Sequence, residues 1–99
     1  VIGIFLDNAI EAAAESNKKY VKMSVINREE RSCMTVEIIN SFLGNIPLEK
    51  IFSKDFTTKT NHSGYGLWEV KRILTKYKNC QLKTDVNNEF FSQKLEIFY

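Results

Sequence analysis

The fold of this chain is decided by the stretch I-F-L-D-N-A-I-E-A-A, residues 4–13, in which apolar and polar residues repeat with the period of an amphipathic helix. One flank of this helix is polar and carries Asp7, Asn8, Glu11 and Glu15. The opposite flank is apolar and carries Ile2, Phe5, Leu6, Ala9, Ile10 and Ala13. The pattern predicts a helix from near Val1 to about Ser16, with Asn17 as its stop signal.

Beyond the helix the apolar period changes from 3.6 to 2, which is typical of strands. Alternation in Val21–Val25 and Met34–Ile38, separated by the charged residues 27–31, predicts an antiparallel hairpin. Two further strands are expected over Cys80–Val86 and Phe90–Phe98. They are joined by an Asn-Asn dipeptide, residues 87–88, which tolerates the positive φ of a tight hairpin turn.

A second motif, N-H-S-G-Y-G-L-W-E-V, covers residues 61–70. Its glycines lead into a helix with apolar residues at Leu67, Val70, Leu74 and Tyr77 that breaks near residues 78–79. Glycines before a helix leave backbone N–H groups and a positive helix end where a phosphate could bind. They also cap helices for purely structural reasons, so both interpretations stay open.

Between Asn40 and Ser63 the period is lost, which predicts a long connection with one short helical turn after Pro47. Connections of this length in small domains are usually functional or mobile. The element order of helix, two strands, loop, helix and two strands predicts an α+β fold. Both helices are expected on one face of a mainly antiparallel sheet.

Composition limits the classes of function. The 99 residues suit one domain, residues 1–99, and 43% apolar with 26% charged residues is ordinary for a globular fold. A net charge of +2, with Lys and Arg scattered along the chain, does not favour a nucleic-acid or lipid partner. Cys33 and Cys80 form no metal or redox motif and are expected to be reduced and buried. No apolar run approaches the roughly 18 residues that cross a bilayer, so the domain is expected to be cytoplasmic.

Taken together, the motifs resemble the GHKL family, the ATP-binding domain shared by gyrase, heat-shock chaperones, histidine kinases and mismatch-repair ATPases. The runs L-D-N-A-I-E-A, F-T-T-K and G-Y-G-L are most similar to the peptide-sensing histidine kinases of Gram-positive quorum-sensing systems. The resemblance covers nearly the whole chain. It implies a two-layer α/β sandwich of the Bergerat type, and the chain is expected to be an excised piece with more of the sheet upstream of Val1.

The resemblance implies that Mg²⁺ and ATP are bound. Asn8 stands at the family's metal-binding asparagine, whereas without the resemblance it would be one polar residue of a surface helix. Mg²⁺ is usually held by one or two protein ligands plus waters, and Glu11, one turn on, could order those waters or be an ordinary surface charge. Asp7 faces about 100° away from Asn8, so a structural or capping role is expected for it.

The position four residues before the asparagine is Ile4, where hydrolysing relatives carry a glutamate that acts as a general base. The resemblance therefore implies poor ATP hydrolysis and transfer of the phosphoryl group to an external histidine on a helical dimerisation domain. No catalytic residue is expected in this chain. The only histidine, His62, is expected to be an exposed loop residue or a phosphate contact.

For the nucleotide itself, Asn40 stands where the family usually has an aspartate that accepts a hydrogen bond from the adenine amino group, and its carbonyl oxygen can still accept. Thr58 and Lys59 are expected to meet the terminal phosphates, unless they belong to a solvated basic loop. The implied nucleotide-binding residues are Asn8, Glu11, Asn40, Phe56, Thr58, Lys59, Gly64, Gly66 and Leu67. Trp68 lies off the apolar stripe and is expected to cover a second surface.

The sequence thus predicts the ATP-binding catalytic domain of a two-component sensor histidine kinase. The implied partners are the helical domain of the same protein, a response regulator and a second subunit in a homodimer, with the full-length protein in the cell membrane. Two alternatives remain. One is a nucleotide-free dimerisation or docking module, favoured by the neutral Asn40 and by the segment Thr57–Ser63, which is short for a lid over a nucleotide. The other is a serine kinase of the anti-sigma type, disfavoured by Ile4.

Overall fold

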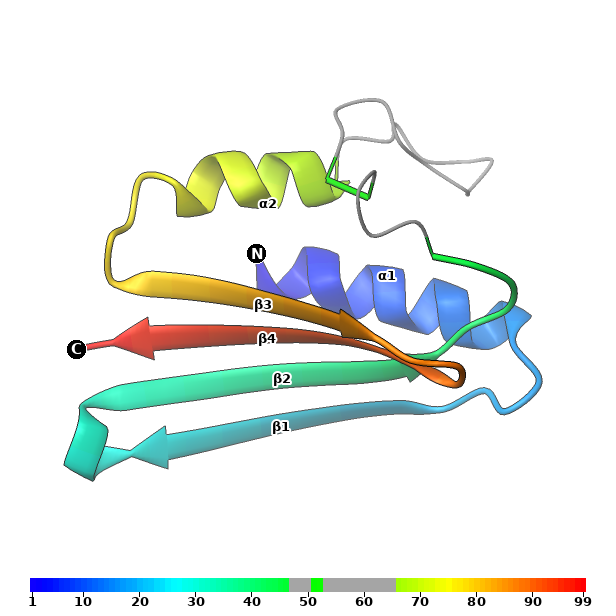
Figure 1. The fold of residues 1–99 in the computed structure, drawn as a ribbon, viewed down its shortest axis with the longest axis horizontal. Helices are drawn as coiled ribbons and strands as arrows, with labels where there is room; N and C mark the ends of the chain where they lie inside the picture. The colour runs from blue at the N-terminus through cyan, green and yellow to red at the C-terminus, as the bar shows by residue number, and fades with distance from the viewer. Residues whose placement is uncertain (47–50, 53–65) are drawn as a thin grey trace.

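The computed structural model describes residues 1–46, 51–52 and 66–99. Its helices are α1 (Ile2–Glu15) and α2 (Gly66–Leu74), and a short 3-10 turn, η1, spans Glu29–Arg31. The strands are β1 (Val21–Arg28), β2 (Cys33–Ser41), β3 (Cys80–Val86) and β4 (Phe90–Phe98). All strand pairs are antiparallel in the order β1-β2-β4-β3, so the α+β prediction is confirmed (Figure 1).

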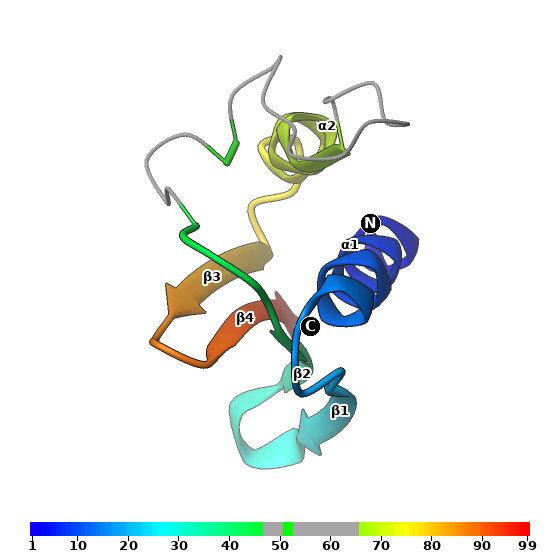
Figure 2. The ribbon, with the colours of Figure 1, turned by 90° about the vertical axis from the view of Figure 1, so that its right-hand side faces the viewer.

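The two helices cover the same face of the sheet (Figures 1 and 2). Helix α1 lies against β2 and also contacts α2. We call the opposite side the open face of the sheet, because none of the described helices covers it. The alternation of strands assigns residues to these faces: Ile38 of β2 points to the helices, and Glu37 and Ile39 therefore point to the open face.

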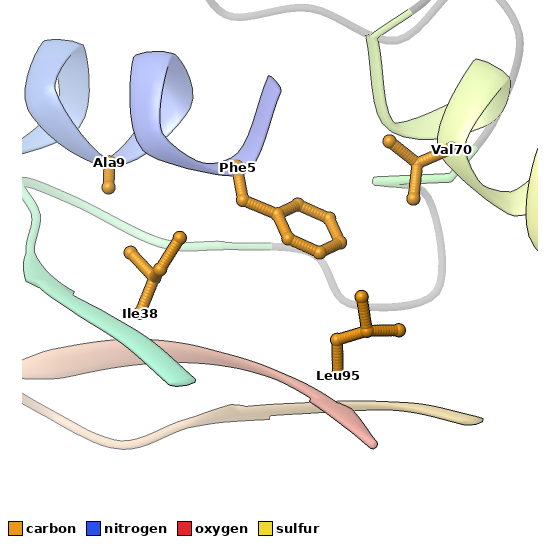
Figure 3. Packing of buried hydrophobic residues seen from close by; sticks show 5 residues of the cluster. All are labelled: Phe5, Ala9, Ile38, Val70 and Leu95. Atoms are coloured by element: carbon orange, nitrogen blue, oxygen red, sulfur yellow. The ribbon is translucent and has the colours of Figure 1, made fainter. Parts of the chain in front are cut away.

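The hydrophobic core lies between the helices and the central strands. Its buried members are Phe5, Ala9, Ile38, Val70 and Leu95 (Figure 3). Val70 is 0% exposed, so α2 is anchored to the core through one fully buried side chain. Burial of an aliphatic side chain contributes about 1.5 to 3 kcal/mol, and Leu67 and Leu74 of α2 also pack against this core. These contacts support a nine-residue helix that is too short to be stable alone.

The hairpin turn between β3 and β4 differs from its prediction. Within the described residues, only Lys19, Ser32 and Gly44 have positive φ, so the expected positive φ at Asn87 and Asn88 is wrong. Instead, the side chain of Asn87 closes the turn, because its Oδ1 accepts hydrogen bonds from the backbone N–H groups of Glu89 (2.8 Å) and Phe90 (2.7 Å). Asparagine favours turns by this route as well as by tolerating the left-handed region.

Helix α2 ends at Leu74, three residues before the predicted Tyr77. At its end the backbone bonds tighten, since Lys76 and Tyr77 donate to the carbonyls three residues back. The ring of Tyr77 is 54% exposed and gains no core contact that would extend the helix. Both cysteines are free, as expected, with Cys33 buried and Cys80 half-buried. The expected turn after Pro47 lies largely outside the described residues.

Candidate functional site

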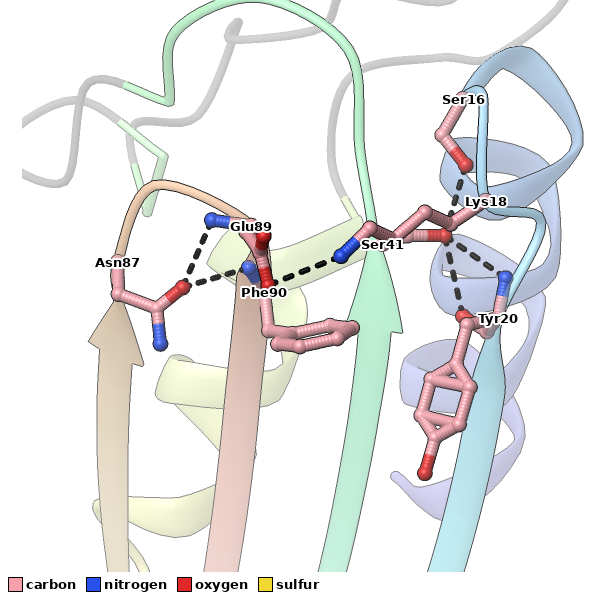
Figure 4. Close-up of polar contacts among 7 residues, drawn as sticks. All are labelled: Ser16, Lys18, Tyr20, Ser41, Asn87, Glu89 and Phe90. Carbon is pink, nitrogen blue, oxygen red and sulfur yellow. Dashed lines mark hydrogen bonds and ion pairs between the residues drawn. The ribbon is translucent and has the colours of Figure 1, made fainter.

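A network of hydroxyl groups ties the end of α1 to the end of β2 (Figure 4). Ser16 Oγ donates to the carbonyl of Ala13 at 2.7 Å and accepts from the N–H of Lys19 at 3.0 Å. Its single proton is then used, so in the 2.7 Å bond between the two serines Ser41 must be the donor. Ser41 Oγ in turn accepts from the N–H of Tyr20 at 2.8 Å. Every hydroxyl in this buried link therefore has a defined direction.

Neither Ser16 nor Ser41 belongs to one of the motifs that pointed to a site in the sequence. The sequence does indicate that both serines lie at the end of an element, because Ser16 follows the apolar pattern of the first helix and Ser41 ends the second strand. What could not be seen is that these two ends meet across 25 positions of sequence. The bond fixes how the polar flank of α1 sits relative to the neighbouring Asn40.

Asn40 lies at the helix-facing side of β2 and is only 3% exposed. Its Nδ2 donates to the backbone carbonyl of Ser41 at 2.9 Å, which holds the amide in one orientation. The carbonyl oxygen Oδ1 is therefore the atom that an adenine amino group would have to reach. A buried, oriented amide acceptor fits recognition of a base edge better than a mobile surface amide does.

Salt bridge and ring contacts close the outer side of this corner (Figure 4). Lys18 Nζ lies 2.9 Å from a carboxylate oxygen of Glu89 and 5.3 Å from the centre of the Phe90 ring. The rings of Tyr20 and Phe90 are tilted by 60° with centres 5.4 Å apart. These exposed contacts link the loop after α1 to the start of β4, so three segments meet at the end of the sheet that holds Asn40.

The polar flank of α1 carries Asn8 and Glu11, and both side chains are half-buried. They lie away from the face of α1 that buries Phe5, Ala9 and Ala13. Asp7 is exposed. Ile4, at the position where the resemblance predicted a missing general base, packs against the core cluster.

Helix α2 begins at Gly66, and the N–H groups of its first turn have no acceptor within the helix. Leu67 packs against the core cluster and fixes this helix start. Trp68 is half-buried, and the guanidinium of Arg72 lies 5.7 Å from the centre of its ring. Arg72 also bonds Glu69, which holds the pKa of that carboxyl below its ordinary value.

Four of the predicted nucleotide-binding residues, together with His62, lie outside the described residues: Phe56, Thr58, Lys59 and Gly64. The described part brings the polar flank of α1 and the start of α2 to the same side of the sheet, since the two helices are in contact and α2 begins above the first turns of α1 (Figure 1). The helix that carries the predicted metal ligand Asn8 and the helix start predicted to bind phosphate therefore lie on one side of the sheet, an arrangement that would suit a phosphate and its cation.

Within residues 1–46, 51–52 and 66–99 there is no group of three or more His, Cys, Asp or Glu side chains that could hold a metal ion. The Mg²⁺ prediction does not need one, because Mg²⁺ bound with a nucleotide takes most of its ligands from phosphate and water. In the same ranges no helix is long and apolar enough to cross a bilayer.

Comparison with known proteins agrees with this geometry. The family model described as GHKL domain matches residues 1–98. Among solved structures, the chain is similar to the nucleotide-free catalytic domain of the histidine kinase ThkA, with a TM-score of 0.72 and 27% sequence identity. That match covers 95% of this chain and 60% of the other, so the chain spans about three fifths of that domain's length. No curated protein sequence gives a significant match.

Proposed function

We propose a function for this chain from the premise that it belongs to the GHKL domain family. The chain is the ATP-binding catalytic domain of a two-component sensor histidine kinase. It binds Mg-ATP and presents the terminal phosphoryl group to a histidine on a separate helical domain. The observation that carries this proposal is that α1, which contains Asn8, and α2, which begins at Gly66, contact each other on one face of the sheet (Figure 1). The likeness to a histidine kinase catalytic domain supports it.

In this proposal, different residues bind the metal, the phosphates and the adenine. Asn8 would offer its amide oxygen to Mg²⁺, and Glu11 would orient the waters of the metal. The first-turn N–H groups of α2 would bind phosphate oxygens, and Asn40 Oδ1 would accept from the adenine amino group. Bound Mg²⁺ supplies neutralisation of the phosphate charge, and the protein adds positioning rather than covalent chemistry.

Ile4 explains why transfer is favoured over hydrolysis. Its side chain packs into the core where a carboxylate would otherwise activate water. Water near the terminal phosphate then has no general base at this position. The acceptor histidine would instead arrive with its own helical domain.

The wider assignment is also a proposal. We place the protein in a quorum-sensing system of the Gram-positive type. This placement rests on three runs that are similar to those of peptide-sensing histidine kinases: L-D-N-A-I-E-A, F-T-T-K and G-Y-G-L. Such a protein would work as a homodimer in the cell membrane, with this domain in the cytoplasm, and would pass its phosphoryl group to a response regulator.

The test is a titration of the chain with a fluorescent ATP analogue, with and without Mg²⁺. We expect weak, Mg²⁺-dependent binding that Asn8→Ala abolishes. Asn17→Ala is the matched control, because Asn17 is an exposed asparagine just beyond the same helix. Saturable binding unaffected by Asn8→Ala would refute the metal assignment, and no binding at millimolar nucleotide would favour the docking-module alternative.

A second experiment tests the transfer step. The chain alone, incubated with radiolabelled ATP, is expected to hydrolyse little and to incorporate no label. Addition of a helical domain that carries a phosphoacceptor histidine is expected to give acid-labile labelling of that domain. Labelling of His62 in the chain alone, or acid-stable labelling of a serine in an added substrate, would contradict the proposal.

A further inference from the structure

The open face of the sheet carries a hollow that the nucleotide proposal does not use. It encloses about 380 Å³ and is bounded by residues from β1, η1, β2, β3 and β4. These residues gather at the end of the sheet that holds η1 and the C-terminus, on the left of Figure 1. The size lies within the range of small-molecule sites, at its lower end.

The hollow is strongly basic. Among the described residues, its lining includes the cationic side chains of Arg28, Arg31, Lys83 and Lys94 and one carboxylate, that of Glu96. The whole chain has a net charge of only +2, so the fold concentrates positive charge here. Residues that are far apart along the chain supply this charge, and the strand pairing brings them together.

Two of the cations stand in an unfavourable arrangement. Lys83 and Lys94 are directly opposite each other on β3 and β4, and like charges in such positions destabilise a sheet. Lys83 Nζ lies 2.8 Å from Glu96 Oε1, and Lys94 Nζ lies 3.9 Å from Glu37 Oε2. The second distance is too long for a hydrogen bond, so Lys94 is only loosely compensated. Residues that are unfavourable for the stability of the fold, as these paired lysines are, often belong to a functional site.

The floor of the hollow offers further donors. Thr35 is 8% exposed, and its hydroxyl lies 3.9 Å from the buried thiol of Cys33, a long and weak contact. The amide of Gln81 also lines the hollow. Apart from Glu96, its charged groups are all donors, which suits an anion and disfavours a cation.

From this geometry we infer that the hollow binds a small phosphate-bearing anion. The guanidinium groups of Arg28 and Arg31 present planar pairs of donors that match two phosphate oxygens, and Lys83 and Lys94 add point charges from the neighbouring strands. The bound anion would relieve the repulsion between the two lysines. The site faces away from α1 and α2, so it is separate from the proposed nucleotide site and does not rest on it.

The experiment uses the whole chain with pyrophosphate as the probe, followed by calorimetry and by NMR shifts of backbone amides. We expect saturable binding with shifts at Thr35, Lys83 and Lys94. The double variant Arg31→Gln with Lys94→Gln is expected to weaken binding by about tenfold or more, since each substitution removes a charge-assisted contact. Glu96→Gln is expected to strengthen binding, because it removes a carboxylate from the lining of the hollow.

The matched control is Lys22→Gln, which removes a cation from the open face of β1 outside the hollow and is expected to change affinity less than twofold. Thermal unfolding of each variant verifies that it is folded. Equal weakening by Lys22→Gln would show nonspecific attraction and overturn the proposal. So would loss of pyrophosphate binding in Asn8→Ala, which would place the probe in the nucleotide site, or unchanged affinity in the double variant.

Discussion

The hydroxyl link between α1 and β2 gives the most direct test of how the site is held together. Ser16 and Ser41 are each 2% exposed, and their 2.7 Å bond joins the two elements that carry Asn8 and Asn40. We predict that Ser16→Ala and Ser41→Ala each destabilise the domain. We also predict that their effects are not additive, because both remove the same shared bond.

The expected magnitude follows from the partners that each change leaves behind. Ser41→Ala removes the acceptor of the Tyr20 N–H, whereas Ser16→Ala removes the acceptor of the Lys19 N–H. After Ser16→Ala the Ser41 hydroxyl can turn to the carbonyl of Tyr20, which lies 3.3 Å away. An unsatisfied buried group costs about 1 to 3 kcal/mol, so we expect about 1 kcal/mol for Ser16→Ala and about 2 kcal/mol for Ser41→Ala. The coupling energy is expected to be about 1 kcal/mol.

Urea unfolding of the parent, both single variants and the double variant measures these energies. In thermal unfolding, 1 kcal/mol corresponds to a shift of about 4 to 8 °C for a domain of this size. Ser24→Ala is the control, because Ser24 is a half-buried serine on the edge strand β1, and its effect is expected to stay within about 0.5 kcal/mol. Strictly additive single effects, or losses no larger than that of Ser24→Ala, would show that the bond between Ser16 and Ser41 does not stabilise the domain.

Three further predictions concern packing, pH and the turn. Val70→Ala, at a fully buried position, is expected to cost about 2 kcal/mol in urea unfolding and to lower protection of α2 amides from hydrogen exchange. The hydrogen bond from Lys83, with the nearby charges of Lys94 and Arg31, lowers the pKa of Glu96 below its ordinary 4.5. The ionised Glu96 therefore stabilises the folded domain above pH 4.5, and this stabilisation is lost as the pH falls through the lowered pKa. Glu96→Gln is therefore expected to flatten the acid side of the stability curve; an unchanged curve would contradict this pairing. Asn87→Ala is expected to cost about 1 kcal/mol, measured as a lower unfolding midpoint, whereas no change would show that its two side-chain bonds contribute nothing.

Much of the fold was predictable because its signals are local. The period of 3.6 in the first residues and the period of 2 in the four strands identified α1 and every strand, and β3 and β4 have the predicted bounds. The end of α2 was predicted three residues too late, because the exposed Tyr77 continues the apolar spacing without a core partner. The Asn87 turn was misread because a side chain, rather than a positive φ, closes it.

The candidate site was predictable only in part. Sequence motifs selected Asn8, Asn40 and Gly66, and the structure shows a half-buried flank, a buried oriented amide and a helix start at these positions. Whether these residues bind nucleotide stays a prediction. The serines that hold α1 to β2 were missed, since nothing in a single strand or helix pattern indicates its partner across 25 residues.

The sequence by itself determined which segments become helices and strands, and it determined the family, because periodicity and short motifs are properties of neighbouring residues. Only the tertiary structure decided that β4 lies between β2 and β3. That order sets Lys83 opposite Lys94 and brings both near Arg28 and Arg31, although the same cations look scattered along the chain. The physical reason is that strand register converts distant positions into neighbours about 5 Å apart, and no local pattern specifies which strands will pair.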